Sequence, residues 1–203
     1  MKSRTDILNF LIKNNNYKTY LEIGVRNPND NFNKIKIDHK DGVDPNANCN
    51  YPITSDHFFE KNNTHYDLIF IDGLHLEDQV KKDIENSIKY LNENGTIIVH
   101  DCNPIEKEHQ KEEYTGGTWN GTTWKGFVHF RLHNPELKMA VIDLDHGCGI
   151  IKKGTQTLFT PSPKELDWEF LVKHRESLLN LISVSEFKKQ FAKKSFIKQL
   201  FTS

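Results

Sequence analysis

The stretch YDLIFIDGLHLEDQVKKDIENSIKYLNENGTIIVHD, residues 66–101, decides the fold. Between its two apolar ends, from about residue 75 to 92, apolar residues recur at intervals of four, four and three: Val80, Ile84, Ile88 and Leu91. This spacing predicts an amphipathic helix, which the Asn-Gly pair at 94–95 ends. The flanking runs are apolar on successive residues, as strands buried on both faces are. Strand, helix and strand form a βαβ unit, so we expect a parallel sheet.

Four further segments are predicted strands. Residues 20–25 run into a glycine turn, and residues 41–45 are stopped by a proline. Residues 139–144 and 148–151 are separated by only three residues, which predicts an antiparallel hairpin at one edge of the sheet. The predicted fold class is therefore α/β, a Rossmann-like and mostly parallel sheet with an antiparallel edge strand and helices on both faces.

The composition excludes several classes of protein. The 203 residues carry 27 Lys+Arg against 28 Asp+Glu, and this balance gives no electrostatic case for binding nucleic acid. No apolar run approaches the ~20 residues of a transmembrane helix, and we predict no signal peptide. The three cysteines (Cys49, Cys102 and Cys148) form no CxxC pair, which favours a reducing compartment and a cytoplasmic location.

The length fits one main domain with a small appendage. We predict a main domain over residues 1–160 and a C-terminal helical extension over residues 161–203. Residues 102–123, inside the main domain, are polar and rich in turn residues. So long a connection after a strand is usually functional, so we predict a lid or an acceptor-binding loop.

Aromatic residues at the end of this loop could bind an acceptor. Trp119, Trp124 and Phe127 could form a platform for a sugar ring, since aromatic faces pack on such rings. A core role is at least as good an expectation for Trp124, which lies on the helix-like stretch from residue 124 to 132.

The C-terminal extension mixes aromatic residues with lysines. Phe187 and Phe191 fall on a different helical face from Phe196 and Leu200, so they do not form one membrane-facing stripe. A packed helix or a homodimer contact is the better expectation for this segment.

Acidic residues and histidines collect where the predicted strands end. In chain order, the strand ends carry Glu22 and Gly24, then Asp44, then Asp72 with His75, then His100 with Asp101. Ligands of an open α/β sheet bind beyond the carboxyl ends of the strands. A single carboxylate there could be a helix cap, but the whole set predicts a nucleotide-like ligand beside a polar pocket that could bind a metal.

The glycine pattern narrows the ligand. After Gly24 the chain has neither the second and third glycines of a dinucleotide fingerprint nor a phosphate-binding P-loop. Asp44 follows Gly24 by 20 residues, the interval at which such a sheet places a carboxylate on a ribose. A ligand with a ribose but no phosphate fits both observations, and S-adenosylmethionine is such a ligand.

Five short motifs resemble the class I S-adenosylmethionine-dependent methyltransferases. They are Tyr-Leu-Glu-Ile-Gly-Val at 20–25, Gly-Val-Asp-Pro at 42–45, Thr-Ser-Asp-His-Phe-Phe at 54–59, Ile-Asp-Gly-Leu-His at 71–75 and Val-His-Asp at 99–101. They occur in the order of the family and are most similar to a small bacterial group associated with glycan and capsule biosynthesis. The resemblance implies a seven-stranded sheet whose last strand is antiparallel.

The same resemblance implies roles for particular residues in binding the cofactor. Glu22 and Gly24 would bound its methionine side, and Asp44 would hold its ribose. Ser55 and Asp56 would lie near its adenine.

The segment from Asp72 to Asp101 resembles a narrower set, the metal-dependent sugar O-methyltransferases of macrolide biosynthesis. That resemblance implies a catalytic pair, His75 as general base with Asp101, and a divalent metal held by Asp72, His100 and Asp101. Asp72 could also touch the cofactor. His100 stands where those enzymes carry an acid, and imidazole suits a transition metal better than Mg²⁺.

The chemistry of a sugar acceptor is consistent with these residues. A sugar hydroxyl is a poor nucleophile, so its methylation needs a base, a cation or both. We therefore predict an S-adenosylmethionine-dependent O-methyltransferase of polysaccharide biosynthesis, acting on a small-molecule or glycan acceptor, with or without a metal. The alternatives are methylation of a small non-sugar acceptor and a non-catalytic S-adenosylmethionine-binding domain.

Overall fold

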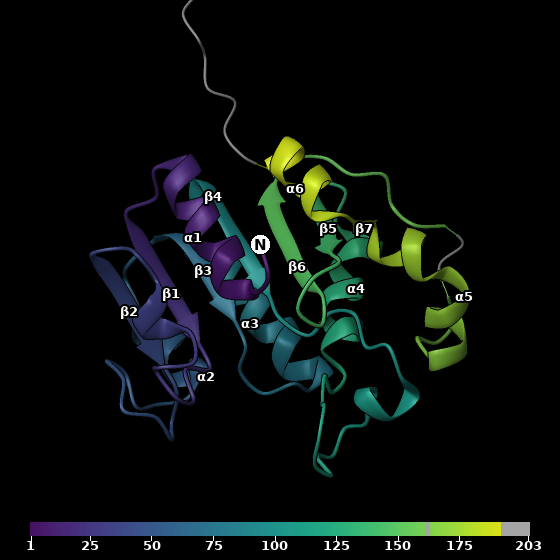
Figure 1. Ribbon diagram of the computed structural model, residues 1–203, viewed down its shortest axis with the longest axis horizontal. Coiled ribbons are helices and arrows are strands. Elements are labelled where there is room, and N and C mark those ends of the chain that lie inside the picture. The colour runs from purple at the N-terminus through teal and green to yellow at the C-terminus, as the bar shows by residue number, and fades with distance from the viewer. Residues whose placement is uncertain (161–162, 192–203) are drawn as a thin grey trace, which may run out of the picture.

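The computed structural model describes residues 1–160 and 163–191 (Figure 1). Its described residues form one seven-stranded sheet with the order β2-β1-β3-β4-β6-β5-β7. The strands are β1 (Thr19–Ile23), β2 (His39–Val43), β3 (Tyr66–Ile71), β4 (Leu91–Val99), β5 (Leu137–Ile142), β6 (Cys148–Lys153) and β7 (Leu181–Ile182). Strands β2, β1, β3 and β4 are mutually parallel, and β6 runs antiparallel to both of its neighbours. The seven-stranded, mostly parallel α/β fold is thereby confirmed.

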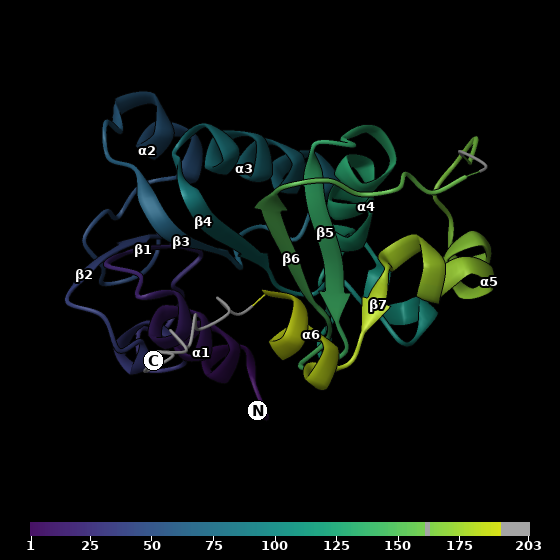
Figure 2. The ribbon, with the colours of Figure 1, turned by 90° about the horizontal axis from the view of Figure 1, so that it is seen from above.

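Helices cover both faces of this sheet (Figure 2). The helices are α1 (Arg4–Asn15), α2 (Ser55–Lys61), α3 (Glu77–Lys89), α4 (Thr123–His133), α5 (Trp168–Leu179) and α6 (Val184–Phe191), with short 3-10 turns η1 (Phe32–Lys34) and η2 (Lys107–Gln110). Helices α2, α3 and α4 lie on one face, and α1 and α6 lie on the other (Figure 2). The predicted helix after β3 is α3.

The side chains of the central strands alternate between two hydrophobic cores. Ile69 and Ile71 of β3 face the core beneath α3 and α4, whereas Leu68 and Phe70 face the core beneath α1 and α6. Both faces are therefore buried, which explains why these strands are apolar on successive residues. Trp124 of α4 is fully buried in the first core, so it is not part of a binding surface.

The antiparallel strand differs from the prediction in its place. Strand β6 lies between β4 and β5 rather than at the edge of the sheet. The edge is β7, which pairs in parallel with β5 through Val141 and Ile142. A two-residue strand carries too little sequence pattern to be predicted, so the hairpin seemed to end the sheet.

The boundary between α3 and β4 also differs from the prediction. The helix ends at Lys89, and Leu91 already pairs with Tyr66 of β3. The next registered pair is Leu68 with Thr96, so β4 carries three more residues than β3 between the two pairs. The Asn-Gly pair at 94–95 therefore lies in a bulge of the strand rather than at the end of the helix.

The C-terminal part of the chain contributes to the same sheet and cores. Leu171 and Leu178 of α5 belong to one core, and Phe187 and Phe191 of α6 belong to the other. The division at residue 160 remains a prediction, and Phe196 and Leu200 lie outside the described residues. Among the described helices, none is both long and apolar enough to cross a membrane.

Candidate active site

The site forms where β3 and β4 end. Ile71 is paired with Val99, so the residues that follow them, Asp72 and His100, start side by side at the carboxyl edge of the sheet. Asp101 comes next in a left-handed conformation with φ 60°, which Asp tolerates better than most residues. His75 lies in the loop between Asp72 and α3.

Asp72, His75, Asp101 and His100 form a ring in which carboxylates and imidazoles alternate. We call it the Asp–His ring. His75 Nε2 lies 3.4 Å from Asp72 Oδ1, and His75 Nδ1 lies 3.4 Å from Asp101 Oδ2. His100 Nδ1 lies 3.2 Å from the same oxygen of Asp72 and 3.0 Å from the same oxygen of Asp101. Each of the two carboxylate oxygens therefore faces both imidazoles.

Two charged residues from distant parts of the chain, Arg4 and Asp145, contact the ring. Arg4, the first residue of α1, places its Nε 3.6 Å from Asp72 Oδ2 and its Nη1 3.4 Å from Asp145 Oδ2. The backbone N–H of Arg4 also donates to Asp145 Oδ2 at 2.8 Å. Asp145, in the turn between β5 and β6, places its Oδ1 3.8 Å from His100 Nε2.

This environment shifts the pKa values of the ring. Burial by itself would lower the pKa of His75, but the hydrogen bond to Asp72 and the charge of Asp101 outweigh it, so the pKa is raised. Burial would lower the pKa of His100, but the charge of Asp72, the hydrogen bond to Asp101 and the nearby Asp145 carboxylate outweigh it, so the pKa is raised well above its ordinary value. Burial would raise the pKa of Asp72, but both histidines hold it well below its usual range.

The loop predicted as a lid packs against His75. The backbone N–H of Thr122 donates to the His75 carbonyl at 2.8 Å, and the Trp119 ring stacks on the imidazole with centroids 4.9 Å apart. His75 Nδ1 lies 3.3 Å from the Trp119 carbonyl oxygen. Buried Asn120 donates to Asp101 Oδ1 at 2.8 Å. The end of the loop therefore orients both predicted catalytic residues.

The predicted cofactor residues lie beside the ring, at the ends of β1 and β2. Gly24 has φ 87°, and a Cβ there would come within 2.1 Å of the Asp72 carbonyl oxygen. Only glycine therefore lets the ends of β1 and β3 approach so closely. Asp44 follows β2 and accepts hydrogen bonds from the backbone N–H groups of Arg26 and Asn46, both at 2.8 Å.

Glu22 is placed differently from Asp44. It is 1% exposed beneath α1, where Tyr20 and Asn31 donate hydrogen bonds to its Oε2. Burial raises its pKa to about 7, and the two hydrogen bonds offset only part of that rise. Its role in cofactor binding remains a prediction, because these contacts engage its side chain inside the protein.

Ser55 and Asp56 lie at the start of α2 and face α3. Gln79 Nε2 donates to Ser55 Oγ at 3.2 Å, to Asp56 Oδ1 at 3.1 Å and to Asp83 Oδ1 at 3.1 Å. Asp83 is 1% exposed, and burial raises its pKa to about 6. Ser55 and Asp56 therefore lie together at the contact between α2 and α3, whereas the Asp–His ring lies at the ends of β3 and β4.

Whether the ring fits a metal can be judged from its donors and its charges. Ligand atoms of Asp72, His75 and Asp101 lie within 4.8 Å of one another, so the predicted ligand His100 is replaced by His75 in this geometric set. The N–H of His100 already points at the two oxygens that a shared ion would need. A hard cation such as Mg²⁺ also prefers an all-oxygen set. The arrangement does not fit Mg²⁺, and metal binding by Asp72, His100 and Asp101 remains a prediction.

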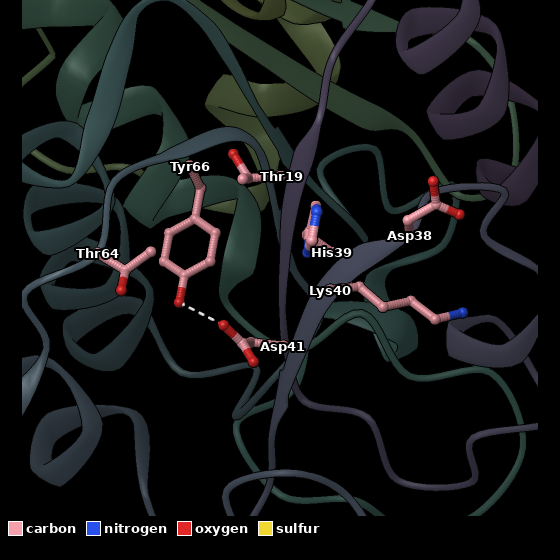
Figure 3. A pocket seen from close by; sticks show the side chains of 7 residues that line it. All are labelled: Thr19, Asp38, His39, Lys40, Asp41, Thr64 and Tyr66. Carbon is pink, nitrogen blue, oxygen red and sulfur yellow. Dashed lines mark hydrogen bonds between the residues drawn. The ribbon is translucent and has the colours of Figure 1, made fainter.

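A separate cavity of about 410 Å³ lies at the amino ends of the strands, opposite the ends that carry the Asp–His ring (Figure 3). Its lining residues come from the amino ends of β1, β2 and β3: Thr19, Asp38, His39, Lys40, Asp41, Thr64 and Tyr66. The Tyr66 hydroxyl donates to Asp41 Oδ2 at 2.8 Å across it. It shares no residue with the Asp–His ring.

Residues 14–102 match the sequence profile of a family described as a methyltransferase domain. This match covers less than half of the 203-residue chain. The matched segment contains β1 to β4 and all four members of the Asp–His ring. The match supports the predicted class, a class I S-adenosylmethionine-dependent methyltransferase. No curated protein sequence matches the chain.

Solved structures of other proteins share the fold of about three quarters of the chain. A putative caffeoyl-CoA O-methyltransferase from Staphylococcus aureus is 20% identical, with a TM-score of 0.53 over 74% of this chain and 82% of its own. A putative O-methyltransferase from Klebsiella pneumoniae is 12% identical, with a TM-score of 0.52 over 75% and 80%. A methyltransferase from Podospora anserina, solved with S-adenosylhomocysteine, is 15% identical, with a TM-score of 0.50 over 75% and 80%.

Arg4, Asn120 and Asp145 are site residues that the sequence did not indicate. They lie in a helix terminus, a loop and a hairpin turn. Asn120 falls in the loop predicted to be functional, and Asp145 is the first residue of the predicted three-residue turn, whereas Arg4 carries no signal in the sequence.

Proposed function

We propose that the chain transfers a methyl group from S-adenosylmethionine to a hydroxyl oxygen of a sugar or glycan precursor, with His75 as the general base. The observation that carries the proposal is the position of His75, held between Asp72 and Asp101 at the carboxyl ends of β3 and β4. We propose that this reaction serves polysaccharide biosynthesis.

The fit of the cofactor is supported by Gly24 and Asp44. Asp44 lies half-buried at the end of β2, where the backbone N–H groups of Arg26 and Asn46 fix its carboxylate. Each of its oxygens keeps a second lone pair, so it can accept the two hydroxyl groups of a ribose. When bound, S-adenosylmethionine supplies an electrophilic methyl group on a positively charged sulfur.

The contacts of His75 suit it to take a proton at Nε2. We assign the hydrogen of the neutral imidazole to Nδ1, which faces two acceptors, the Trp119 carbonyl at 3.3 Å and Asp101 at 3.4 Å. Nε2 faces one acceptor, Asp72 Oδ1 at 3.4 Å, and in this tautomer it takes the proton of the acceptor hydroxyl. The oxygen–methyl bond forms, the carbon–sulfur bond breaks, and the proton stays on His75.

Asp101 and Trp119 position this base. Asn120 fixes one oxygen of Asp101 at 2.8 Å and leaves the other toward His75. The Trp119 ring covers one face of the imidazole, and Tyr114, which is 64% exposed, lies 5.8 Å from Trp119 between ring centroids. Aromatic surfaces beside a base suit the apolar face of a sugar ring, which supports a sugar as the acceptor.

A methyl-transfer assay with a panel of acceptors tests the proposal. The protein is incubated with S-adenosylmethionine labelled at the methyl group, and with free sugars, nucleotide sugars or small phenols. We expect label in a sugar ether. Label in a phenol would support a non-sugar acceptor instead. Transfer to none of them, together with binding of S-adenosylhomocysteine, would support the non-catalytic alternative.

A further inference from the structure

We infer that N–H groups of His100 and Arg4 occupy, from within the chain, the carboxylate oxygens of Asp72 and Asp101 that a divalent ion would need. The site therefore works without a metal, in contrast to the metal-dependent enzymes that its sequence resembles. The inference rests on the proposed function for the reaction it serves, but its own test is ion binding, which can be measured without any reaction.

The His100 imidazole takes the place that a shared ion would need. Its Nδ1 lies 3.0 Å from Asp101 Oδ2 and 3.2 Å from Asp72 Oδ1. A magnesium ion shared by these oxygens would lie about 2.0–2.1 Å from each, directly before an N–H group that already points at both. The ion and the N–H hydrogen carry the same sign of charge, so they exclude one another.

The His100 imidazole is fixed in this place. Its side chain is 6% exposed, and the Phe70 ring contacts it edge-on with centroids 6.2 Å apart. Its second nitrogen lies 3.8 Å from Asp145, so carboxylates face both of its nitrogens. Burial and these contacts on both sides hold Nδ1 toward Asp72 and Asp101.

The remaining oxygens of the two carboxylates are also occupied. Arg4 Nε lies 3.6 Å from Asp72 Oδ2, and Asn120 donates to Asp101 Oδ1 at 2.8 Å. Each of the four oxygens of Asp72 and Asp101 therefore faces a nitrogen of the chain, which leaves none of them open to an ion.

Titration with Mn²⁺ alone, followed by calorimetry or by the signal of the free ion in electron paramagnetic resonance, tests the inference. For the wild-type protein we expect no binding up to about 1 mM Mn²⁺. For His100→Asp, which removes the N–H group facing both carboxylates and adds an oxygen donor, we expect binding at least about tenfold tighter. His65→Asp adds the same charge at an exposed position before β3 and should bind no more Mn²⁺ than the wild type.

The outcomes of this titration decide the inference in either direction. Wild-type binding in the micromolar range that Asp72→Asn abolishes would overturn it. A folded His100→Asp protein without any gain would overturn it as well, because His100 would then not be what excludes the ion. If His100→Asp does not fold, the wild-type titration still decides, and Arg4→Gln replaces the variant with the same expected gain. A chain that methylates no acceptor but shows these binding results would refute the proposed function and leave this inference standing.

Discussion

At the scale of the residue, His75 is the group on which the proposed reaction depends. We expect His75→Ala to lower kcat by ~10²–10⁴-fold, the usual contribution of a general base, while the affinity for S-adenosylhomocysteine stays nearly unchanged. His65→Ala is the matched control, because His65 is exposed and precedes β3 at the opposite edge of the sheet. Full activity in His75→Ala would leave positioning of the acceptor as the source of the rate.

The raised pKa of His75 gives this base a characteristic pH dependence. Asp72 and Asp101 favour its protonated form, which cannot accept a proton, so the rate should rise with pH through a midpoint above 6.5. In Asp101→Asn one of these charges is lost, so the midpoint of kcat/KM against pH should move down. An unchanged midpoint in this variant would contradict the contact between Asp101 and His75.

Residues at the ends of parallel strands could be predicted from the sequence, whereas their partners from elsewhere could not. Asp72, His75, His100 and Asp101 each follow a strand that the apolar pattern identifies, and the parallel register then brings them to one edge. Arg4 and Asp145 are 141 residues apart and meet only through the packing of α1 beside the β5–β6 turn. No local pattern encodes such a contact.

At the scale of the element, the close approach of β1 and β3 brings Gly24 against the backbone of Asp72 and so shapes the site. The βαβ unit and its register follow from periodicity, but the distance between two strand ends depends on a single missing side chain. Gly24 and Gly116 both have positive φ, 87° and 98°, yet only at Gly24 would a Cβ meet another atom. Substituting alanine at both glycines therefore separates two costs. Both variants strain a backbone of positive φ, but only Gly24→Ala also creates a steric clash.

We expect Gly24→Ala to lower the free energy of unfolding by about 3 kcal/mol more than Gly116→Ala does. The reason is that the new methyl group meets the backbone at Asp72, which cannot move away as a side chain could. Denaturant unfolding of the two variants measures this difference. Equal losses in both would show that the strands separate easily and that their approach is not a constraint.

At the scale of the whole molecule, buried Glu22 couples stability to pH. Its pKa of about 7 in the folded protein lies above its ordinary value of 4.5. The folded state therefore holds the proton more tightly, so its contribution to stability is complete below pH 4.5 and is lost as the pH rises through 7. Glu22→Gln, which stays neutral, removes this loss.

We expect the stability of Glu22→Gln relative to the wild type to increase by about 2–3 kcal/mol between pH 5 and pH 8. The measurement is urea unfolding of both proteins at the two pH values. Glu112→Gln, in the exposed part of the loop after β4, is the control and should show no such increase. A pH-independent difference for Glu22→Gln would mean that Glu22 is ionised throughout this range.

The central claim is that the cofactor binds at the carboxyl ends of the strands, beside the Asp–His ring. Calorimetric titration with S-adenosylhomocysteine tests this claim most directly. Two variants are compared, and each replaces an aspartate at one end of β2. Asp44→Ala should weaken binding by about 10–150-fold, the loss of about 1.5–3 kcal/mol from hydrogen bonds to a charged group. Asp38→Ala, in the cavity at the amino end of the same strand, should leave the affinity unchanged. Unchanged affinity in a folded Asp44→Ala protein, or loss of affinity in Asp38→Ala instead, would contradict the account.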